Sequence, residues 1–230
     1  MRIGGLQKLS LIDYPGKLAA VVFTQGCNFR CGYCHNPELV LPQEYCPVVP
    51  EEEVMAFLRS RQEYLEGVVV TGGEPTVQGD LISFLDKIKR LGYLVKLDTN
   101  GSQPGVLKQL ISLRLVNYVA MDVKSSLGRY REVINAPLSV EKIEESIRAI
   151  IDSGIQHEFR TTVVKAFHSV GDLMEIRSLV EGARQYNLQR ARLDGKILDK
   201  GLLAQEQYSD AEFDRFKKIV SGAMEPAHNL

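Results

Sequence analysis

Residues 18–37 read LAAVVFTQGCNFRCGYCHNP, an apolar segment that runs directly into a loop with three cysteines. The apolar part, residues 18–24, is rich in small and β-branched side chains, which is typical of a buried strand. Cys27, Cys31 and Cys34 then follow in the spacing C-x3-C-x2-C. The sequence therefore predicts a strand whose carboxyl end carries a cluster of thiol groups.

Beyond this loop, short apolar segments alternate with longer segments of helical periodicity, which is the order of a parallel sheet with crossover helices. The expected strands are 18–24, 67–71, 93–97, 116–121, 158–164 and 188–193. The expected helices are 54–65, 81–91, 106–113, 140–151, 173–180 and 213–220. These units are fewer than a complete (β/α)8 barrel has. We therefore expect an α/β fold, a partial (β/α)6 barrel whose parallel sheet is open on one side, in a single domain over residues 1–230.

Composition and charge narrow the class of protein. The 230 residues are 44% hydrophobic and 25% charged, which is enough apolar material for one substantial core. The 28 Lys and Arg residues nearly balance the 29 Asp and Glu residues, so no bulk field favours nucleic acid or an anionic membrane. No segment has the ~20 apolar residues of a membrane-spanning helix, and the N-terminus lacks the apolar region of a secretory signal. We expect a cytoplasmic protein that binds neither nucleic acid nor membrane.

The cysteine spacing favours an iron–sulfur cluster. Three thiolates on one short loop can hold a cubic [4Fe-4S] cluster and leave one iron without a protein ligand, and an open coordination position suits catalysis. A zinc site with Cys46 as fourth ligand is a poorer alternative, because 11 residues separate Cys46 from Cys34 and a second C-x2-C pair is missing. His35 adjoins Cys34 and is expected to point elsewhere. A disulfide would need a strained turn, and Cys46 is expected to be an ordinary thiol.

The loop, with Tyr33 one position before its last cysteine, resembles the radical S-adenosylmethionine (SAM) superfamily. Residues 5–39, with IDYPGK, VVFTQGCNFRC and YCHNPEL, are similar to glycyl-radical enzyme activases, in particular to the activating proteins of anaerobic ribonucleoside-triphosphate reductase. The resemblance implies a [4Fe-4S] cluster bound by Cys27, Cys31 and Cys34, with SAM chelating the fourth iron. It also implies that one electron from the cluster cleaves SAM to methionine and a 5'-deoxyadenosyl radical, which removes a hydrogen atom from the substrate.

Polar motifs follow the expected strands, and the carboxyl ends of parallel strands share one edge of a sheet. We expect the loops that begin at the following residues to converge on one site: Gln25, Gly72, Asp98, Asp122 and Lys165. Gly72 and Gly73 free the backbone to approach a ligand, and Glu74 can accept from an ammonium group. The resemblance implies that this GGEP segment holds the amino group of SAM. The alternative is a simple strand exit.

Asp98 and Thr99 lie at the end of the third expected strand, and Asp122 and Lys124 lie at the end of the fourth. Two carboxylates at neighbouring strand ends can bind a cation or ribose hydroxyls, and Lys124 can pair with the SAM carboxylate. The resemblance implies that the aspartates and Thr99 help to build a monovalent-cation site beside SAM, and that Lys124 contacts SAM. The alternative is a capping aspartate and a solvated lysine.

Other polar residues carry weaker signals. Asn36 matches an active-site asparagine of the activases. Arg160 can reach a carboxylate if it faces inward, but the alternation along its strand leaves its face undecided. Tyr130 fits the activase pattern, although a tyrosine in a helix usually serves packing. The remaining histidines have no partners in motif spacing and are expected at the surface: His157, His168 and His228.

The last expected strand departs from the resembled family. Many glycyl-radical activases have a SAM-contacting histidine near the end of this strand, whereas residues 191–201 read ARLDGKILDKG. Arg192, Asp194 or Lys196 could substitute for it. The departure leaves the SAM contacts at this position, and the substrate, undecided.

The leading hypothesis is an activase that removes the α-hydrogen of a glycine in a large partner enzyme, because an open barrel leaves a lateral mouth for a loop of another protein. The resemblance implies anaerobic ribonucleotide reductase as the partner and flavodoxin or ferredoxin as the electron donor. An alternative is a radical SAM enzyme that acts on a small molecule, a nucleoside or another peptide. A third hypothesis, a non-enzymatic iron–sulfur or zinc module, would make the strand-end motifs coincidences.

Overall fold

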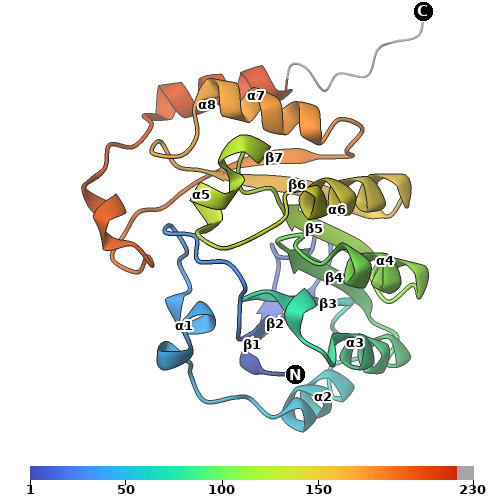
Figure 1. The fold of residues 1–230 in the computed structure, drawn as a ribbon. Coiled ribbons are helices and arrows are strands. Elements are labelled where there is room, and N and C mark those ends of the chain that lie inside the picture. The colour runs from blue at the N-terminus through green and yellow to red at the C-terminus, as the bar shows by residue number, and fades with distance from the viewer. Residues whose placement is uncertain (222–230) are drawn as a thin grey trace, which may run out of the picture.

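The structure is a computed structural model and describes residues 1–221. Its centre is a seven-stranded sheet in the order β1-β2-β3-β4-β5-β6-β7 (Figure 1). The strands are β1 (Ile3–Ser10), β2 (Ala19–Thr24), β3 (Gly67–Gly72), β4 (Leu94–Thr99), β5 (Tyr118–Asp122), β6 (Gln156–Val163) and β7 (Tyr186–Arg190). Strands β2 to β7 are parallel, and β1 and β7 are the two edges of the sheet. The expected α/β fold with an open parallel sheet is confirmed.

The sequence does not predict β1, which pairs antiparallel with β2 at the edge of the sheet. This pairing is irregular, with register shifts after Ile3 and after Gln7, and an irregular edge strand leaves little periodic signal. Gly4 packs closely on the first residue of the cysteine loop, because a Cβ at this position would lie 2.5 Å from Cγ of Gln25. β1 therefore supports the start of that loop.

The eight helices among the described residues include all six that the sequence predicts, with shifted ends, and the short helices α1 and α5. Their bounds are α1 (Pro37–Val40), α2 (Glu51–Arg59), α3 (Leu81–Arg90), α4 (Pro104–Ser112), α5 (Tyr130–Ile134), α6 (Glu141–Asp152), α7 (Val170–Leu179) and α8 (Asp210–Ser221). Single 3-10 turns occupy Pro42–Glu44, Pro75–Val77, Leu127–Arg129 and Lys200–Ala204.

The bounds of most expected elements are shifted by a few residues, and two of the shifts have a visible cause. The helix expected over 54–65 ends at Arg59, and Leu65 reaches the core from a turn, in which its N–H donates to the carbonyl of Arg61 at 3.0 Å. The strand expected over 188–193 begins two residues earlier, at Tyr186, whose hydroxyl donates to Oγ1 of Thr161 at 3.0 Å. The first boundary is set by a turn that still carries an apolar residue into the core, and the second by a contact with a distant strand; local periodicity reports neither.

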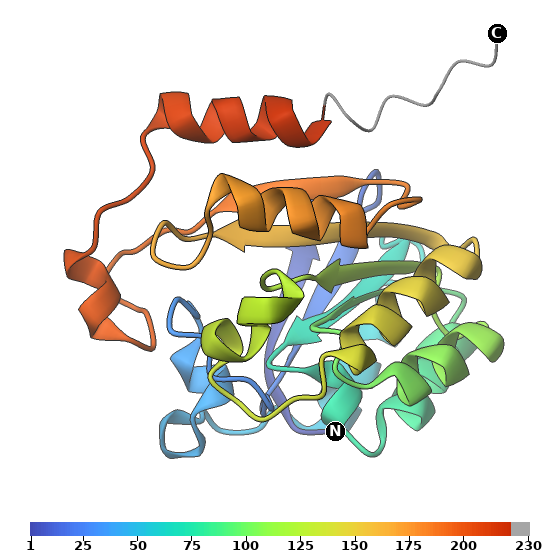
Figure 2. The same ribbon diagram turned by 45° about the horizontal axis from the view of Figure 1, so that its top comes forward.

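The two faces of the sheet differ. The crossover helices lie along the outer face (Figures 1 and 2), where their apolar side chains join the main core. Helix α8 packs against α7 and β7. The inner face holds a smaller apolar cluster: Tyr14, Ala19, Val21, Val69, Tyr118 and Ala120. Strand pairing places Lys96 beside Tyr118 and Asp122 beside Arg160, so these charged residues share the inner face with that cluster.

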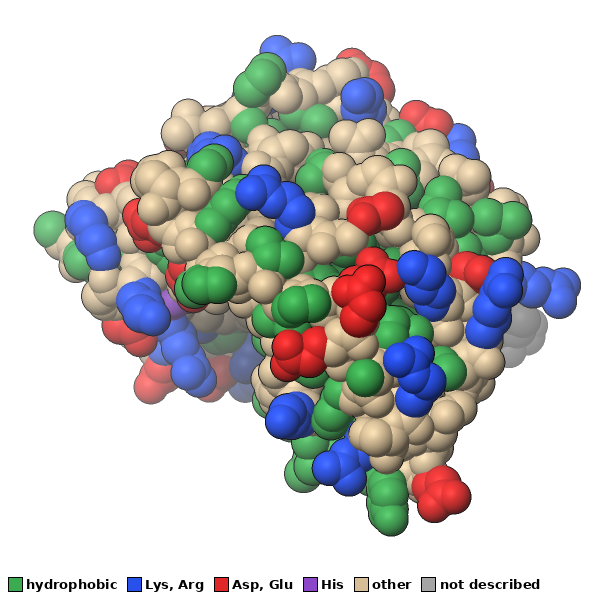
Figure 3. Space-filling model, turned by 90° about the horizontal axis from the view of Figure 1, so that it is seen from below, with side chains coloured by type: hydrophobic (Ala, Val, Ile, Leu, Met, Phe, Trp, Pro, Cys, Tyr) green, Lys and Arg blue, Asp and Glu red, His purple; other side chains and the backbone are tan. Residues whose placement is uncertain are grey.

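The surface is mixed in charge. Figure 3 shows Lys and Arg side chains intermingled with Asp and Glu across one face of the described residues, in agreement with the formal net charge of -1. None of the helices in residues 1–221 combines the length and the apolar character that crossing a bilayer requires.

Candidate active site

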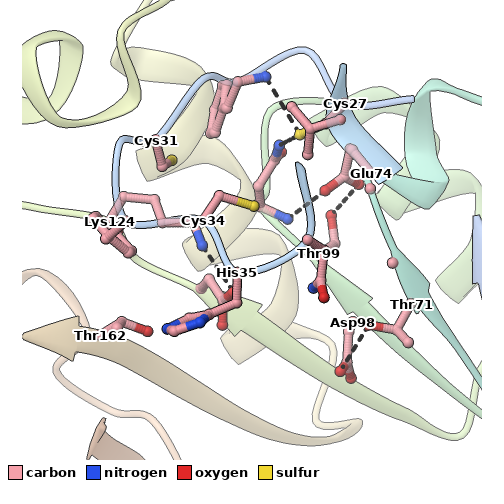
Figure 4. A pocket seen from close by; sticks show the side chains of 18 of the residues that line it. Cys27, Cys31, Cys34, His35, Thr71, Glu74, Asp98, Thr99, Lys124 and Thr162 are labelled. Carbon is pink, nitrogen blue, oxygen red and sulfur yellow. Dashed lines mark hydrogen bonds and ion pairs between the residues drawn. The ribbon is translucent and has the colours of Figure 1, made fainter. Parts of the chain in front are cut away.

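A cavity of about 250 Å³ lies at the carboxyl ends of strands β2 to β6. Figure 4 shows how the cysteine loop and the strand ends surround it. Every site residue predicted from the sequence lines this cavity: Cys27, Cys31, Tyr33, Cys34, Asn36, Gly72, Gly73, Glu74, Asp98, Thr99, Asp122, Lys124 and Arg160. β6 contributes Arg160 and Thr162 to the lining from the strand itself, and the loop that begins at Lys165 reaches the site from behind, where the ring of Phe167 packs on Tyr33. Lys165 itself pairs with Glu206 at 2.7 Å.

Backbone contacts hold the cysteine loop in a compact shape. The N–H of Cys34 donates to the carbonyl of Cys31 at 3.0 Å, and the N–H of Arg30 donates to the carbonyl of Ile134 in α5 at 2.8 Å. The Arg30 guanidinium also donates to the carbonyl of Cys27 at 2.6 Å. Short-range turns and one partly buried arginine thus bring the three thiols to a single cavity.

All four cysteines are free thiols. Burial raises the pKa of Cys27 to about 12 and the pKa of Cys31 to about 11. These two side chains therefore stay protonated in the protein alone and need a positively charged metal group to become thiolates. Cys46 is exposed and lies outside the cavity lining. No three His, Cys, Asp or Glu side chains within residues 1–221 lie close enough together to hold a single metal ion.

The glycine pair after β3 packs on the backbone of the cysteine loop. The N–H of Gly73 donates to the carbonyl of Thr24 at 2.8 Å, and the N–H of Glu74 donates to the carbonyl of Gly26 at 2.7 Å. A Cβ at Gly73 would lie 2.2 Å from the Gly26 oxygen, and Gly72 has a φ of +108°. Side chains are therefore excluded at both positions by the approach of two backbones and by the left-handed conformation.

Glu74 joins the loops that follow β3 and β4. Its side chain is buried, and Oε1 accepts from the Thr76 N–H at 3.0 Å, from the Thr76 hydroxyl and from the Thr99 hydroxyl at 2.7 Å. Oε2 accepts from the Asn100 N–H at 2.6 Å. Burial raises the pKa of Glu74 in spite of these donors. A carboxylate offers about four acceptor positions, so the four donors match what Glu74 can accept, with three of them at Oε1.

Arg160 faces inward and settles the question that the alternation left undecided. Its Nε lies 2.8 Å from Oδ1 of Asp122, and its Nη1 lies 3.4 Å from Oδ2 of Asp98. Lys124 Nζ lies 2.9 Å from Oδ2 of Asp122. Burial would raise the pKa of Asp122, but the charges of Arg160 and Lys124 outweigh burial and hold it well below the usual range. Asp122 is therefore a carboxylate with a positive partner on each oxygen.

Two buried residues fix the backbone of Lys124. The Lys124 N–H donates to the hydroxyl of Tyr130 at 3.2 Å, and the Lys124 carbonyl lies 2.8 Å from Nε2 of His168. Nδ1 of His168 accepts from the Val164 N–H at 3.1 Å, so Nε2 carries the proton and donates to Lys124. Tyr130 and His168 are both 0% exposed.

The expected surface positions of two histidines are wrong. His168 is buried against Lys124, and His157 is buried beside Phe159, with ring centroids 5.5 Å apart. An isolated histidine in a sequence gives no sign of such partners. His228 lies outside the described residues.

His35 and the segment after β7 also differ from expectation. His35 lines the cavity, and its Nδ1 lies 3.8 Å from Oδ1 of Asp194. Arg192, Asp194 and Lys196 are exposed and are not among the cavity-lining residues. Of the three candidates for the missing last-strand histidine, Asp194 alone approaches a lining residue.

The residues present fit a [4Fe-4S] cluster that has three protein ligands. Three free thiols face one cavity, and no fourth cysteine lines it. The buried hydroxyl of Tyr33 lines the same cavity and has no hydrogen-bond partner in residues 1–221. Buried polar atoms in folded proteins normally have a hydrogen-bond partner. A buried hydroxyl without one, beside a cluster of thiols, therefore indicates a site for a polar ligand.

Comparisons with known proteins agree with this geometry. MJ1227 of Methanocaldococcus jannaschii, which is named as a glycyl-radical enzyme activating enzyme, is 36% identical over 82% of this chain and 79% of its own length. The pyruvate formate-lyase-activating enzyme of Clostridium pasteurianum is 33% identical over 54% of this chain and 52% of its own, so the chain spans about half of that relative.

A solved structure shows the same fold. SuiB of Streptococcus suis, bound to S-adenosylmethionine, superposes with a TM-score of 0.70 at 16% identity, over 89% of this chain and 47% of SuiB. Residues 21–179 match the model of the radical SAM superfamily, whose members use a [4Fe-4S] cluster and SAM. The chain therefore belongs to the radical SAM superfamily and, with MJ1227, to its family of glycyl-radical enzyme activating enzymes.

Proposed function

We propose that this protein cleaves SAM reductively and generates a glycyl radical on a partner enzyme, anaerobic ribonucleotide reductase. The observation that supports this proposal is the single cavity in which three free cysteines meet the polar ends of four further strands. The sequence identity of 36% to MJ1227, over most of both chains, supports the assignment of this protein as an activase of a glycyl-radical enzyme.

In this proposal Cys27, Cys31 and Cys34 hold the [4Fe-4S] cluster. The cluster, when bound, supplies the electron that splits SAM into methionine and a 5'-deoxyadenosyl radical. The buried thiols lose their protons as metal binds. The N–H of Phe29, 3.4 Å from Sγ of Cys27, stabilises the negative charge of the Cys27 thiolate.

The strand-end residues would bind and orient SAM. Glu74, a buried acidic residue that lines the cavity, suits the amino group of SAM, and Lys124, held by its backbone, suits the carboxylate. The unpartnered hydroxyl of Tyr33 and the Asn36 side chain provide further polar contacts at the cavity wall. Arg160 keeps Asp122 ionised and in place.

The partner would enter from the inner side of the open sheet. A glycine loop gives up one α-hydrogen atom to the 5'-deoxyadenosyl radical, which becomes 5'-deoxyadenosine and leaves the unpaired electron on the glycine. Reduced flavodoxin or ferredoxin supplies the electron that each SAM cleavage consumes.

Anaerobic reconstitution with iron and sulfide tests the proposal. The reduced protein should produce 5'-deoxyadenosine from SAM and, with anaerobic ribonucleotide reductase, a glycyl doublet in the electron paramagnetic resonance spectrum. A reductase variant with alanine at the radical glycine is the matched control and should give no doublet. Rapid SAM cleavage without a doublet on the reductase contradicts the assignment of anaerobic ribonucleotide reductase as the partner. A doublet on pyruvate formate-lyase would instead make that enzyme the partner. Absence of a doublet on both favours the small-molecule alternative.

A further inference from the structure

A buried lysine lies beside the residues expected to bind a monovalent cation. Lys96 is two positions before Asp98 on β4, on the inner face of the sheet, and is 2% exposed. Its Nζ lies 2.5 Å from Oδ1 of Asp98 and 5.8 Å from the centroid of the Tyr118 ring. A buried lysine in such a position is retained with a partner of opposite charge, and Asp98 is that partner.

The carboxylates expected to bind the cation already have partners. Oδ1 of Asp98 accepts from Lys96, and its Oδ2 lies 3.3 Å from the Thr71 hydroxyl and 3.4 Å from Nη1 of Arg160. The two oxygens of Asp122 are held by Arg160 and Lys124. Three fixed cationic side chains therefore surround two carboxylates, and each carboxylate oxygen has at least one donor.

These donors do not fit a metal cation. A cation bound by Asp98 and Asp122 would have to displace hydrogen bonds from at least two of the three side chains, and it would then lie next to their positive charges. Like charges so close together, in a partly buried site, repel strongly. The disagreement with the expected cation site thus comes largely from Lys96, whose ammonium group already occupies Oδ1 of Asp98.

We propose that the ammonium group of Lys96 takes the place of the monovalent cation, so that SAM binding by this protein requires no added K⁺ or Na⁺. Lys96 is a positioning residue: it holds Asp98 against Thr71 and Arg160 and does not line the cavity itself. The inference rests on the proposed function, because it presumes that SAM occupies the cavity.

SAM affinity of the anaerobically reconstituted protein, measured in buffers whose only monovalent cation is K⁺, Na⁺ or tetramethylammonium, tests the inference directly. Tetramethylammonium is too large and too poorly coordinated by oxygen to replace a bound alkali ion. We expect dissociation constants that agree within about twofold in the three buffers, a difference well below 1 kcal/mol. Binding that appears only with K⁺ or Na⁺ overturns the inference and leaves the proposed function intact. Absence of SAM binding in every buffer contradicts the proposed function itself.

Substitution of Lys96 should make SAM binding depend on the monovalent cation in the buffer, which SAM binding by the wild-type protein should not. Lys96→Met removes the ammonium group and keeps the apolar stem, so it leaves Oδ1 of Asp98 free for a cation. In tetramethylammonium this variant should bind SAM about tenfold more weakly, and K⁺ or Na⁺ should restore the affinity. Lys96→Arg, which retains the charge, should stay insensitive to the cation.

Lys89→Met is the matched control, because Lys89 is a partly buried lysine that donates to the neutral Asn117 side chain at 2.8 Å, away from the cavity. This control should show neither weaker SAM binding nor cation rescue. A Lys96→Met protein that folds and binds SAM with unchanged affinity in all three buffers contradicts a role for Lys96. If that variant does not fold, the wild-type comparison alone decides.

Discussion

Cys31 is buried, whereas Cys27 and Cys34 are partly exposed, so Cys31 offers the cleanest test of the ligand assignment. Cys31→Ala should abolish cluster assembly, because two remaining thiolates cannot hold the cube. Iron and sulfide content and the brown absorbance after anaerobic reconstitution measure this. Cys46→Ala changes an exposed cysteine outside the cavity and should retain the full cluster. A Cys31→Ala protein that keeps its iron and cleaves SAM would remove Cys31 from the ligand set.

Glu74 has a structural role that the GGEP motif alone does not indicate. Glu74→Ala should lower the free energy of unfolding of the cluster-free protein by about 3 kcal/mol, because it deprives four donors of their acceptor in a buried place. Urea unfolding measures this change. The reconstituted variant should also bind SAM more weakly.

The exposed Glu63 provides the control for that measurement. Glu63→Ala should change the free energy of unfolding by no more than about 0.5 kcal/mol. Equal stabilities of the Glu74→Ala and Glu63→Ala proteins would show that the hydrogen bonds of Glu74 contribute nothing net.

The site residues could be chosen from the sequence, but their partners could not. Position after a strand predicts that Asp98, Asp122 and Glu74 meet at one edge of the sheet, and all three line the cavity. The inward direction of Arg160 and the burial of His168 depend on which neighbouring strands supply countercharges or carbonyl groups. Such pairings join residues that lie far apart in the chain, so no local spacing contains them.

The turn after β3 and the cysteine loop are fitted to each other through Gly73. Gly73→Ala would place a Cβ 2.2 Å from the carbonyl oxygen of Gly26, and a backbone oxygen cannot rotate away as a side chain can. The cysteine loop would have to shift, so we expect a lower iron content after reconstitution and a lower melting temperature.

Gly79 lies in the same connection and serves as the control. A Cβ at Gly79 would have no neighbour within 4 Å, so Gly79→Ala should leave the iron content unchanged and stability equal or higher by less than about 1 kcal/mol. If Gly73→Ala took up iron as fully as Gly79→Ala does, the close backbone contact would not be needed for the site.

The central parallel strands are predictable because each is a short apolar run followed by a polar motif, as in β3, β4 and β5. Strand β1 and helix α5 are not. β1 pairs irregularly at an edge, and α5 has only five residues, although its Ile134 carbonyl anchors Arg30 of the cysteine loop. The buried side chains of α5, Tyr130, Val133 and Ile134, span barely one helical turn, which is too short for a periodic pattern to stand out in the sequence.

Across the molecule, the site is assembled at one end of an open sheet, and most of the buried apolar side chains of the described residues belong to one main core. Two buried histidines bind a proton less readily in the folded protein than in the unfolded chain, since burial lowers the pKa of both His157 and His168. The unfolded chain therefore binds more protons than the folded chain once the pH falls below the ordinary histidine pKa of about 6.5. The free energy of unfolding should then decrease with falling pH, by at most about 1.4 kcal/mol per pH unit for each histidine.

Urea unfolding of the cluster-free protein between about pH 7.5 and pH 5.5 measures this slope, in a range above the titration of most carboxylates. His168→Gln should start from a lower stability, because it disturbs the hydrogen bonds to Lys124 and Val164, but its stability should depend less steeply on pH than that of the wild type. Gly79→Ala, which adds a methyl group with no neighbour within 4 Å and changes no titratable group, should keep the wild-type slope. A His168→Gln slope as steep as the wild-type slope would mean that the buried His168 ring takes up a proton as readily in the folded protein as in the unfolded one.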